Sequence, residues 1–213
     1  MINIVKTGIT TILATIVLGI YSKTAAQTNF TFDEVQIDQN QVIAMAMPQE
    51  YSSYKLMILE QNSNERRCWR ESETKLYPIV VEPLLLNFNF AGICEQATDS
   101  NDYSIRVNGN DLSRSHRLIL ENVGDEIKLF SISLTGDKNL IGRTRGISDG
   151  IMKIFLEPGW KFTKRSYQEK VLGHFYFSYD SFAAKQDAVE QKIAEIEAQI
   201  PDFLELDDNL NRQ

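Results

Sequence analysis

The stretch RLILENVGDEIKLFSI, residues 117–132, has a pattern of short runs and turn residues that indicates the fold class of this 213-residue chain. Two runs of strand length, 117–121 and 127–132, flank the triplet Val123-Gly124-Asp125. This triplet is typical of a tight turn, because glycine adopts positive φ angles and aspartate bonds to nearby backbone. The stretch therefore predicts two short strands joined by a tight turn.

Similar short apolar or alternating runs recur along the chain between turns rich in Asn, Asp and Gly. They cover residues 42–47, 55–60, 79–81, 84–90, 103–107, 152–156 and 174–179. No long helical pattern separates them, which disfavours a parallel sheet with crossover helices. We predict a mainly β domain over 41–180, an antiparallel sandwich or barrel of about nine or ten strands. Within it, the run 84–90 is predicted to be the strand buried on both faces.

The N-terminal residues 1–26 have the order of a secretory signal peptide. Lys6 precedes an apolar run over 9–20, and Ala25 and Ala26 supply small residues for cleavage. The uncharged stretch 7–22 is shorter than most spanning helices, so a retained membrane anchor is the weaker alternative. We expect export to the periplasm or the medium, with no membrane span after cleavage. Residues 27–40 are polar and are predicted to be a flexible leader.

The C-terminal part of the chain changes character. Residues 181–200 are rich in Ala, Glu, Gln and Lys, and Pro201 ends this segment. Apolar side chains follow at spacings of four and three, which predicts an amphipathic helix: Val189, Ile193, Ile196 and Ile200. This helix either lies on the sheet or extends loosely from it, or it mediates self-association or contact with a partner helix. Residues 201–213 are predicted to be an acidic disordered tail.

Charge and cysteine content limit the classes of function. The chain has 29 acidic and 22 basic side chains, so nucleic acid is a poor partner by electrostatics. Cys68 and Cys94 are its two cysteines, and in an oxidising compartment two thiols in one domain usually pair. A redox or metal role would need a Cys-x-x-Cys pair or nearby histidines, and the sequence has neither. We therefore expect a structural disulfide, with no metal and no cofactor.

Catalytic signatures are weak. The chain lacks a Gly-x-Ser-x-Gly elbow, and its two histidines, His116 and His174, are isolated in the sequence. No residue is therefore assigned a catalytic role. Paired carboxylates, as glycosidases use, stay an alternative because such residues meet only in the fold. The acidic residues near the expected disulfide are Glu60, Glu71, Glu82 and Glu95.

A basic and aromatic group supplies the candidate binding site. It consists of Arg143, Arg145, Trp160, Lys161, Lys164 and Arg165. Aromatic faces next to cationic side chains suit sugar rings or anionic polymers, through stacking and charge-assisted hydrogen bonds. The alternative follows from strand alternation: Trp160 and Phe162 face the core, while Lys161 and Arg165 lie outside.

Several segments resemble an uncharacterised family of exported proteins found mainly in cyanobacteria. The most distinctive are EPLLLNFNFAGIC (82–94), IGRTRG (141–146) and PGWKFTKR (158–165), and shorter ones lie at 59–61, 68–69, 98–106, 111–112 and 172–174. The resemblance covers roughly 41–180. It implies an exported domain with paired cysteines and brings no activity that could be transferred to these residues.

Three hypotheses for function follow. The first is an exported, noncatalytic binding or structural module of the cell envelope, contacting envelope glycan or another envelope protein. The second is a cell-wall or polysaccharide hydrolase that uses paired carboxylates. The third is an assembly protein that acts through the helix at 181–200.

Overall fold

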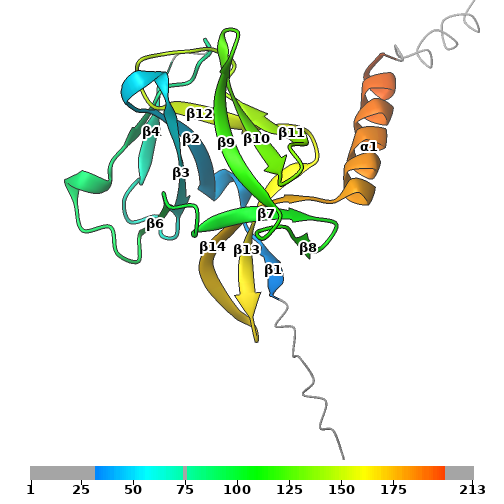
Figure 1. Ribbon diagram of the computed structural model, residues 1–213, viewed down its shortest axis with the longest axis horizontal. Coiled ribbons are helices and arrows are strands. Elements are labelled where there is room, and N and C mark those ends of the chain that lie inside the picture. Colours follow the sequence, from blue (N-terminus) through cyan, green and yellow to red (C-terminus); the bar gives the residue numbers. More distant parts are fainter. Residues whose placement is uncertain (1–31, 74–75, 200–213) are drawn as a thin grey trace, which may run out of the picture. The chain divides into compact units, whose positions relative to one another are not determined.

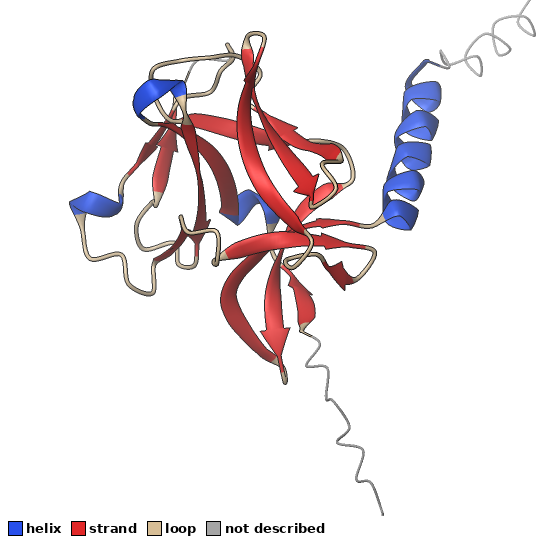
Figure 2. Ribbon diagram, viewed as in Figure 1, coloured by secondary structure: helices blue, strands red, loops and turns tan. Residues whose placement is uncertain are grey.

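The computed structural model describes residues 32–73 and 76–199. The predicted signal peptide (1–26), residues 27–31 of the predicted leader and the predicted tail (201–213) lie outside the described residues. The described part consists mainly of strands in antiparallel sheets, which confirms the predicted fold class (Figure 2). None of its helices combines the length and apolar character needed to cross a bilayer.

The stretch 117–132 forms a hairpin within a seven-stranded antiparallel sheet (Figure 1). Gly124, at φ 71°, supplies the positive φ of the turn. Across the sheet the strands are β6 (Cys94–Ala97), β3 (Tyr54–Gln61), β2 (Val42–Pro48), β12 (Met152–Leu156), β11 (Lys138–Arg143), β10 (Glu126–Ser133) and β9 (His116–Val123). In β10 every second side chain is buried, as in a strand with one covered face.

A second sheet has five strands. Their order is β1 (Asp33–Gln36), β13 (Trp160–Tyr167), β14 (Lys170–Tyr179), β7 (Tyr103–Val107) and β8 (Asn110–Asp111). The pair β14 and β7 is parallel, and the other neighbours are antiparallel. Strand β1 corrects the predicted flexible leader: residues 33–36 pair with β13 and belong to the sheet. Polar composition was misleading here, because an edge strand can be polar and still supply backbone hydrogen bonds.

Two short strands, β4 (Trp69–Glu71) and β5 (Val81–Pro83), form a third sheet. With them the described residues contain fourteen strands, more than the nine or ten predicted, because several strands are only two to four residues long. Three short 3₁₀ helices complete the β-rich part: η1 (Gln39–Gln41), η2 (Glu50–Ser52) and η3 (Leu85–Asn87).

The prediction that 84–90 forms a doubly buried strand is wrong. The segment contains η3, with Leu86 99% exposed and Leu85 buried. An apolar triplet followed by alternating Asn and Phe fits either a buried strand or an irregular segment, and here three of the apolar side chains anchor an irregular one. Leu85, Phe88 and Phe90 pack against the cluster around the cysteines.

The strand that is buried on both faces is β2. Its even-numbered side chains, Val42, Ala44 and Ala46, join a large core in which residues of both larger sheets meet. Its odd-numbered side chains, Ile43 and Met45, join a smaller cluster with the two cysteines. Strand β2 therefore separates the sandwich core from a second, disulfide-containing core.

The predicted C-terminal helix is present as α1 (Ser181–Gln199). The backbone N–H of Ser181 donates to the side-chain oxygen of Asn108 at 2.9 Å. In the predicted apolar stripe, Val189, Ile193 and Ile196 are 49–59% exposed, so the described residues leave this stripe open to solvent. Ile200 lies outside the described residues.

Candidate functional site

The predicted disulfide is present between Cys68 and Cys94, with a Cα–Cα distance of 5.8 Å. It links the residue before β4 to the first residue of β6. The backbone N–H of Cys68 also donates to the side-chain oxygen of Gln61 on β3. Trp69 follows Cys68 directly, so these two links position its indole ring.

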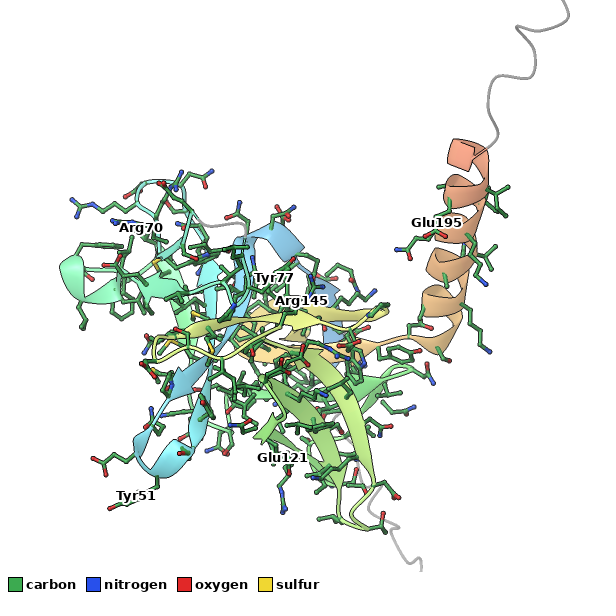
Figure 3. All side chains as sticks on the ribbon, turned by 90° about the horizontal axis from the view of Figure 1, so that it is seen from above. Tyr51, Arg70, Tyr77, Glu121, Arg145 and Glu195 are labelled. Atoms are coloured by element: carbon green, nitrogen blue, oxygen red, sulfur yellow. A yellow bond between two sulfur atoms is a disulfide. The ribbon has the colours of Figure 1, made fainter. Side chains whose placement is uncertain are left out.

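A groove of about 820 Å³ lies beside this disulfide. Its lining combines one aromatic ring, three arginines and polar or acidic side chains: Trp69, Arg66, Arg67, Arg70, Asn40, Gln41, Gln61, Asn64, Glu71 and Glu73. All three arginines are exposed, and Figure 3 shows Arg70 projecting from this part of the chain. The pair Arg70 and Glu82 is 3.5 Å apart and largely exposed, so it contributes little stability.

A second groove, of about 500 Å³, joins the first at Asn40, Trp69 and Glu71, which line both. It adds Trp160 and Lys161 from β13, so both tryptophans of the chain line the connected grooves. We call the two together the tryptophan groove.

Glu71 lies where the two parts of the tryptophan groove meet and accepts hydrogen bonds from two neighbouring side chains. Its carboxylate accepts two hydrogen bonds from Lys153 at 2.8 and 2.9 Å. It also accepts a long hydrogen bond, 3.4 Å, from the indole N–H of Trp69. At the other end, the ring of Trp160 packs 5.3 Å from that of Tyr179. Both tryptophans pack against a core but are only partly buried, so part of each side chain is open to the groove.

Two of the six predicted binding residues, Trp160 and Lys161, line the tryptophan groove. Arg143 is paired with Glu157 at 2.5 Å and with Glu126 at 3.4 Å. These carboxylates raise the pKa of Arg143, although burial opposes the effect.

Arg145 packs over the Phe155 ring, 4.4 Å from its centroid. Its guanidinium also donates a 2.8 Å hydrogen bond to the hydroxyl of Tyr77, and Figure 3 shows these two side chains together. Arg145 therefore contacts the ring of a groove residue from outside the groove lining.

Lys164 and Arg165 point to opposite faces of the five-stranded sheet. Buried Lys164 donates to Glu60 and Glu95 at 2.6 and 2.7 Å. Arg165 donates to Asp111 at 2.9 Å and to the Tyr176 hydroxyl at 2.7 Å. The six predicted residues therefore do not form one surface, and ligand binding by them stays a prediction.

The strand-alternation alternative fits part of this arrangement. Phe162 is in the large core and Trp160 packs against it, while Arg165 lies on the other face. The same alternation puts Lys164 on the inward face with Phe162, and Lys164 is buried there, although the alternative did not name it. Its charge is tolerated there because two carboxylates meet it.

The carboxylates considered for hydrolysis have different environments. Glu60 and Glu95 do meet, but on the ammonium of Lys164, and their side chains are only 11% and 29% exposed. Glu71 is held by Lys153 in the tryptophan groove, and Glu82 is exposed beside Arg70. The meeting of Glu60 and Glu95 thus forms a buried ion triad between β13 and the larger sheet.

The outer face of the five-stranded sheet carries a second polar cluster. Asp111 accepts from both Arg165 and Tyr176. Burial alone would raise the pKa of Asp111, but hydrogen bonds from Ser113 and Tyr176 and the charge of Arg165 lower it below 3.8. Burial raises the pKa of Tyr176. Asp111 and Arg165 therefore form a charged, hydrogen-bonded pair at neutral pH.

Sequence analysis missed Trp69 and the arginines beside it as candidate binding residues. The signal was present in RRCWR, residues 66–70, which combines three cations and an indole around a cysteine. It also missed a contact between Ser104 and His174, which are 70 residues apart and carry no local motif.

Comparison with known proteins identifies a family but no function. A family model described as "Protein of unknown function (DUF3747)" matches residues 9–182. The chain matches no curated protein and no solved structure. The match covers the whole β-rich part and ends at the second residue of α1. The resemblance to an uncharacterised family is thereby confirmed, whereas export and a cyanobacterial distribution stay predictions. The chain belongs to the DUF3747 family of proteins of unknown function.

Proposed function

We propose that the protein is an exported binding module of the cell envelope, and that it contacts glycan in the tryptophan groove without catalysing a reaction there. The observation that carries the proposal is that Trp69 and Trp160 line two grooves that meet. The disulfide supports export, because such bonds persist in oxidising compartments.

The lining of the groove suits an anionic glycan. Partly exposed indole faces can stack on sugar rings, and guanidinium groups can form paired hydrogen bonds with carboxylates or hydroxyls. Arg66 and Arg67 line the larger part of the tryptophan groove and are exposed. Lys161 lines the smaller part. Polar side chains such as Asn40 add donors and acceptors between them.

The negative charge of the rest of the chain favours binding of an anionic glycan in the arginine-lined groove over binding elsewhere. The net charge is −7, so a polyanion is repelled by most of the molecule. Arginines concentrated in one groove create a local exception. We therefore expect weak, salt-sensitive binding of an acidic polysaccharide, confined to the groove.

Intrinsic fluorescence gives a direct test, because both tryptophans of the chain line the groove. The purified protein is titrated with alginate, an acidic polysaccharide, and with dextran, a neutral one. We expect alginate to change the emission and dextran to have a smaller effect. Trp69→Ala and Trp160→Ala should each weaken alginate binding roughly tenfold.

The matched control is Tyr51→Asn. Tyr51 is 97% exposed and lies outside the groove (Figure 3), so the variant removes an accessible aromatic ring elsewhere. Asparagine tolerates the φ of 58° at this position. Alginate affinity should be unchanged in this variant. No emission change with either polysaccharide, or equal loss of affinity in Tyr51→Asn, would overturn the proposal.

The exposed stripe of α1 favours assembly as a second candidate function. Val189, Ile193 and Ile196 form one apolar line that the described residues leave uncovered. If the helix self-associates, the protein should sediment as an oligomer, and Ile193→Glu should return it to a monomer. A monomer at high concentration would remove self-association as its role.

A further inference from the structure

Ser104 and His174 form a close pair on the five-stranded sheet. The Ser104 hydroxyl oxygen lies 2.8 Å from Nε2 of His174. The pair forms because β7 and β14 are parallel neighbours in which Ser104 lies opposite Tyr176. His174 is two residues before Tyr176, so its side chain leaves the same face of the sheet.

The partner of the other ring nitrogen determines the direction of this hydrogen bond. Nδ1 of His174 lies 2.9 Å from the backbone carbonyl oxygen of Asn101. A carbonyl oxygen can only accept, so Nδ1 carries a proton. In a neutral ring Nε2 is then an acceptor, and the Ser104 hydroxyl donates to it. This is the tautomer in which a histidine can take a proton from a serine.

The surroundings of His174 favour the neutral ring. Burial lowers the pKa of His174 below its ordinary value of 6.5, and the charge of Arg165 lowers it further. The hydrogen bond to Asn101 and the charges of Asp111 and Asp102 act in the opposite direction but are weaker. At neutral pH the ring is therefore available as a base.

A cavity of about 430 Å³ gives small molecules access to this pair. Ser104 and His174 both line it, although Ser104 itself is largely buried. Arg117 of β9 lines the same cavity and is exposed, with no carboxylate paired to it among the described residues. The cavity thus combines a hydroxyl, a base and an available cation.

We propose that Ser104 is a nucleophile and His174 its general base in the hydrolysis of small carboxylic esters bound in this cavity. The inference adds an activity at a place separate from the tryptophan groove and does not depend on glycan binding.

Each step of the reaction follows from these groups. The Ser104 oxygen attacks the ester carbonyl carbon while its proton passes to Nε2 of His174. Arg117 can stabilise the negative oxygen of the tetrahedral intermediate. The C–O bond to the alcohol then breaks, and the alcohol leaves with the proton from His174. Water attacks the acyl-serine, again giving a proton to His174, and the acid leaves as the proton returns to Ser104.

Covalent labelling of the full-length protein tests the nucleophile without any variant. The protein is incubated with a fluorophosphonate probe, which reacts with activated serines, and digested for mass spectrometry. We expect the label on Ser104. The protein should also hydrolyse p-nitrophenyl acetate. A protein that stays unlabelled, or carries the label on another residue, would overturn the proposal.

Variants test the role of each group. Ser104→Ala should lose both labelling and ester hydrolysis. His174→Gln should slow hydrolysis by roughly a hundredfold or more. The matched control is Ser53→Ala, an exposed serine that does not line this cavity, and this variant should retain the activity. Thermal melting verifies that each variant is folded. Unchanged hydrolysis in folded Ser104→Ala would refute the assignment, whatever the result of the alginate titration.

Discussion

The five-stranded sheet and the disulfide segment, which we define as residues 62–94, hold their cations in different ways. In the sheet, Lys164 and Arg165 are each paired with a carboxylate and are largely buried. In the disulfide segment, Arg66 and Arg67 are exposed. The sheet is ordered by backbone pairing of five strands, whereas the described part of the segment (62–73 and 76–94) has two strands of three residues, β4 and β5, and one covalent crosslink.

The two regions therefore obtain their stability from different sources and leave different charged side chains available to a ligand. Paired strands with paired charges stabilise the sheet but leave few of its cations available to a ligand. The disulfide constrains the segment without using its charged side chains, so the arginines beside Trp69 remain open to solvent. Changes to charge should therefore harm the sheet most, and loss of the disulfide should harm the segment most.

Lys164→Ala should produce the largest loss of stability. It leaves Glu60 and Glu95 close together with no cation, and removing one partner of a buried ion group costs about 3–5 kcal/mol. Urea unfolding measures the change. The control is Lys161→Ala, three residues earlier on β13, which removes a less buried lysine and should change the unfolding free energy by less than about 0.5 kcal/mol. Equal effects of the two variants would show that the triad does not stabilise the fold.

Loss of the disulfide should rank next. The double variant Cys68→Ala and Cys94→Ala opens a link between residues 26 positions apart, which the loop-closure model values at ~3.5 kcal/mol. Because Trp69 follows Cys68, tryptophan emission should also change under native conditions. Labelling of Ser104, which lies in the five-stranded sheet, should persist in the folded variant. Unchanged emission together with loss of labelling would show that the disulfide supports the surroundings of Ser104 and does not position Trp69.

Much of the fold could be predicted from the sequence because local patterns carry it. The hairpin of 117–132 has alternating side chains and a glycine turn, and both are local properties. The strand predicted over 84–90 is wrong because a short, mostly apolar segment does not distinguish a strand from an anchored irregular segment. Strand β1 failed because a polar edge strand has no apolar pattern, and its pairing with β13 depends on residues far along the chain.

The sites were harder to predict because their partners are distant in sequence. Lys164 is 104 residues from Glu60 and 69 from Glu95, so nothing near Lys164 identifies the two carboxylates that meet it. Trp160 and Lys161 were predicted from their own composition, which is local. Trp69 lines the same groove because the neighbouring disulfide and a hydrogen bond to Glu71 hold it there, and neither contact is a pattern in the local sequence. Composition can suggest the kind of residue in a site, but tertiary pairing determines which charges are free.

Asp111→Asn should lower the free energy of unfolding by an intermediate amount. Comparison with Glu82→Gln sets an ion pair of the sheet against one of the disulfide segment. The variant removes the charge that meets Arg165 on a partly buried face, at a cost of about 1–2 kcal/mol. Glu82→Gln breaks the exposed pair with Arg70 and should cost less than about 0.5 kcal/mol. Chemical unfolding of both variants gives the comparison. A larger effect of Glu82→Gln would reverse the proposed difference between the regions.

The smallest effect is a pH dependence assigned to His174. Because burial and Arg165 lower its pKa, the unfolded chain takes up a proton before the folded protein does as the pH falls. The free energy of unfolding should therefore decrease as the pH drops through about 6.5 and continue to decrease until it passes the lowered pKa. Asp111 also has a lowered pKa, but its contribution is lost only at acidic pH below about 4. Urea unfolding between about pH 7.5 and pH 5.5 therefore separates the contribution of His174 from that of Asp111. The slope should flatten in His174→Gln, and an unchanged slope would mean that another group on the molecule titrates in this range.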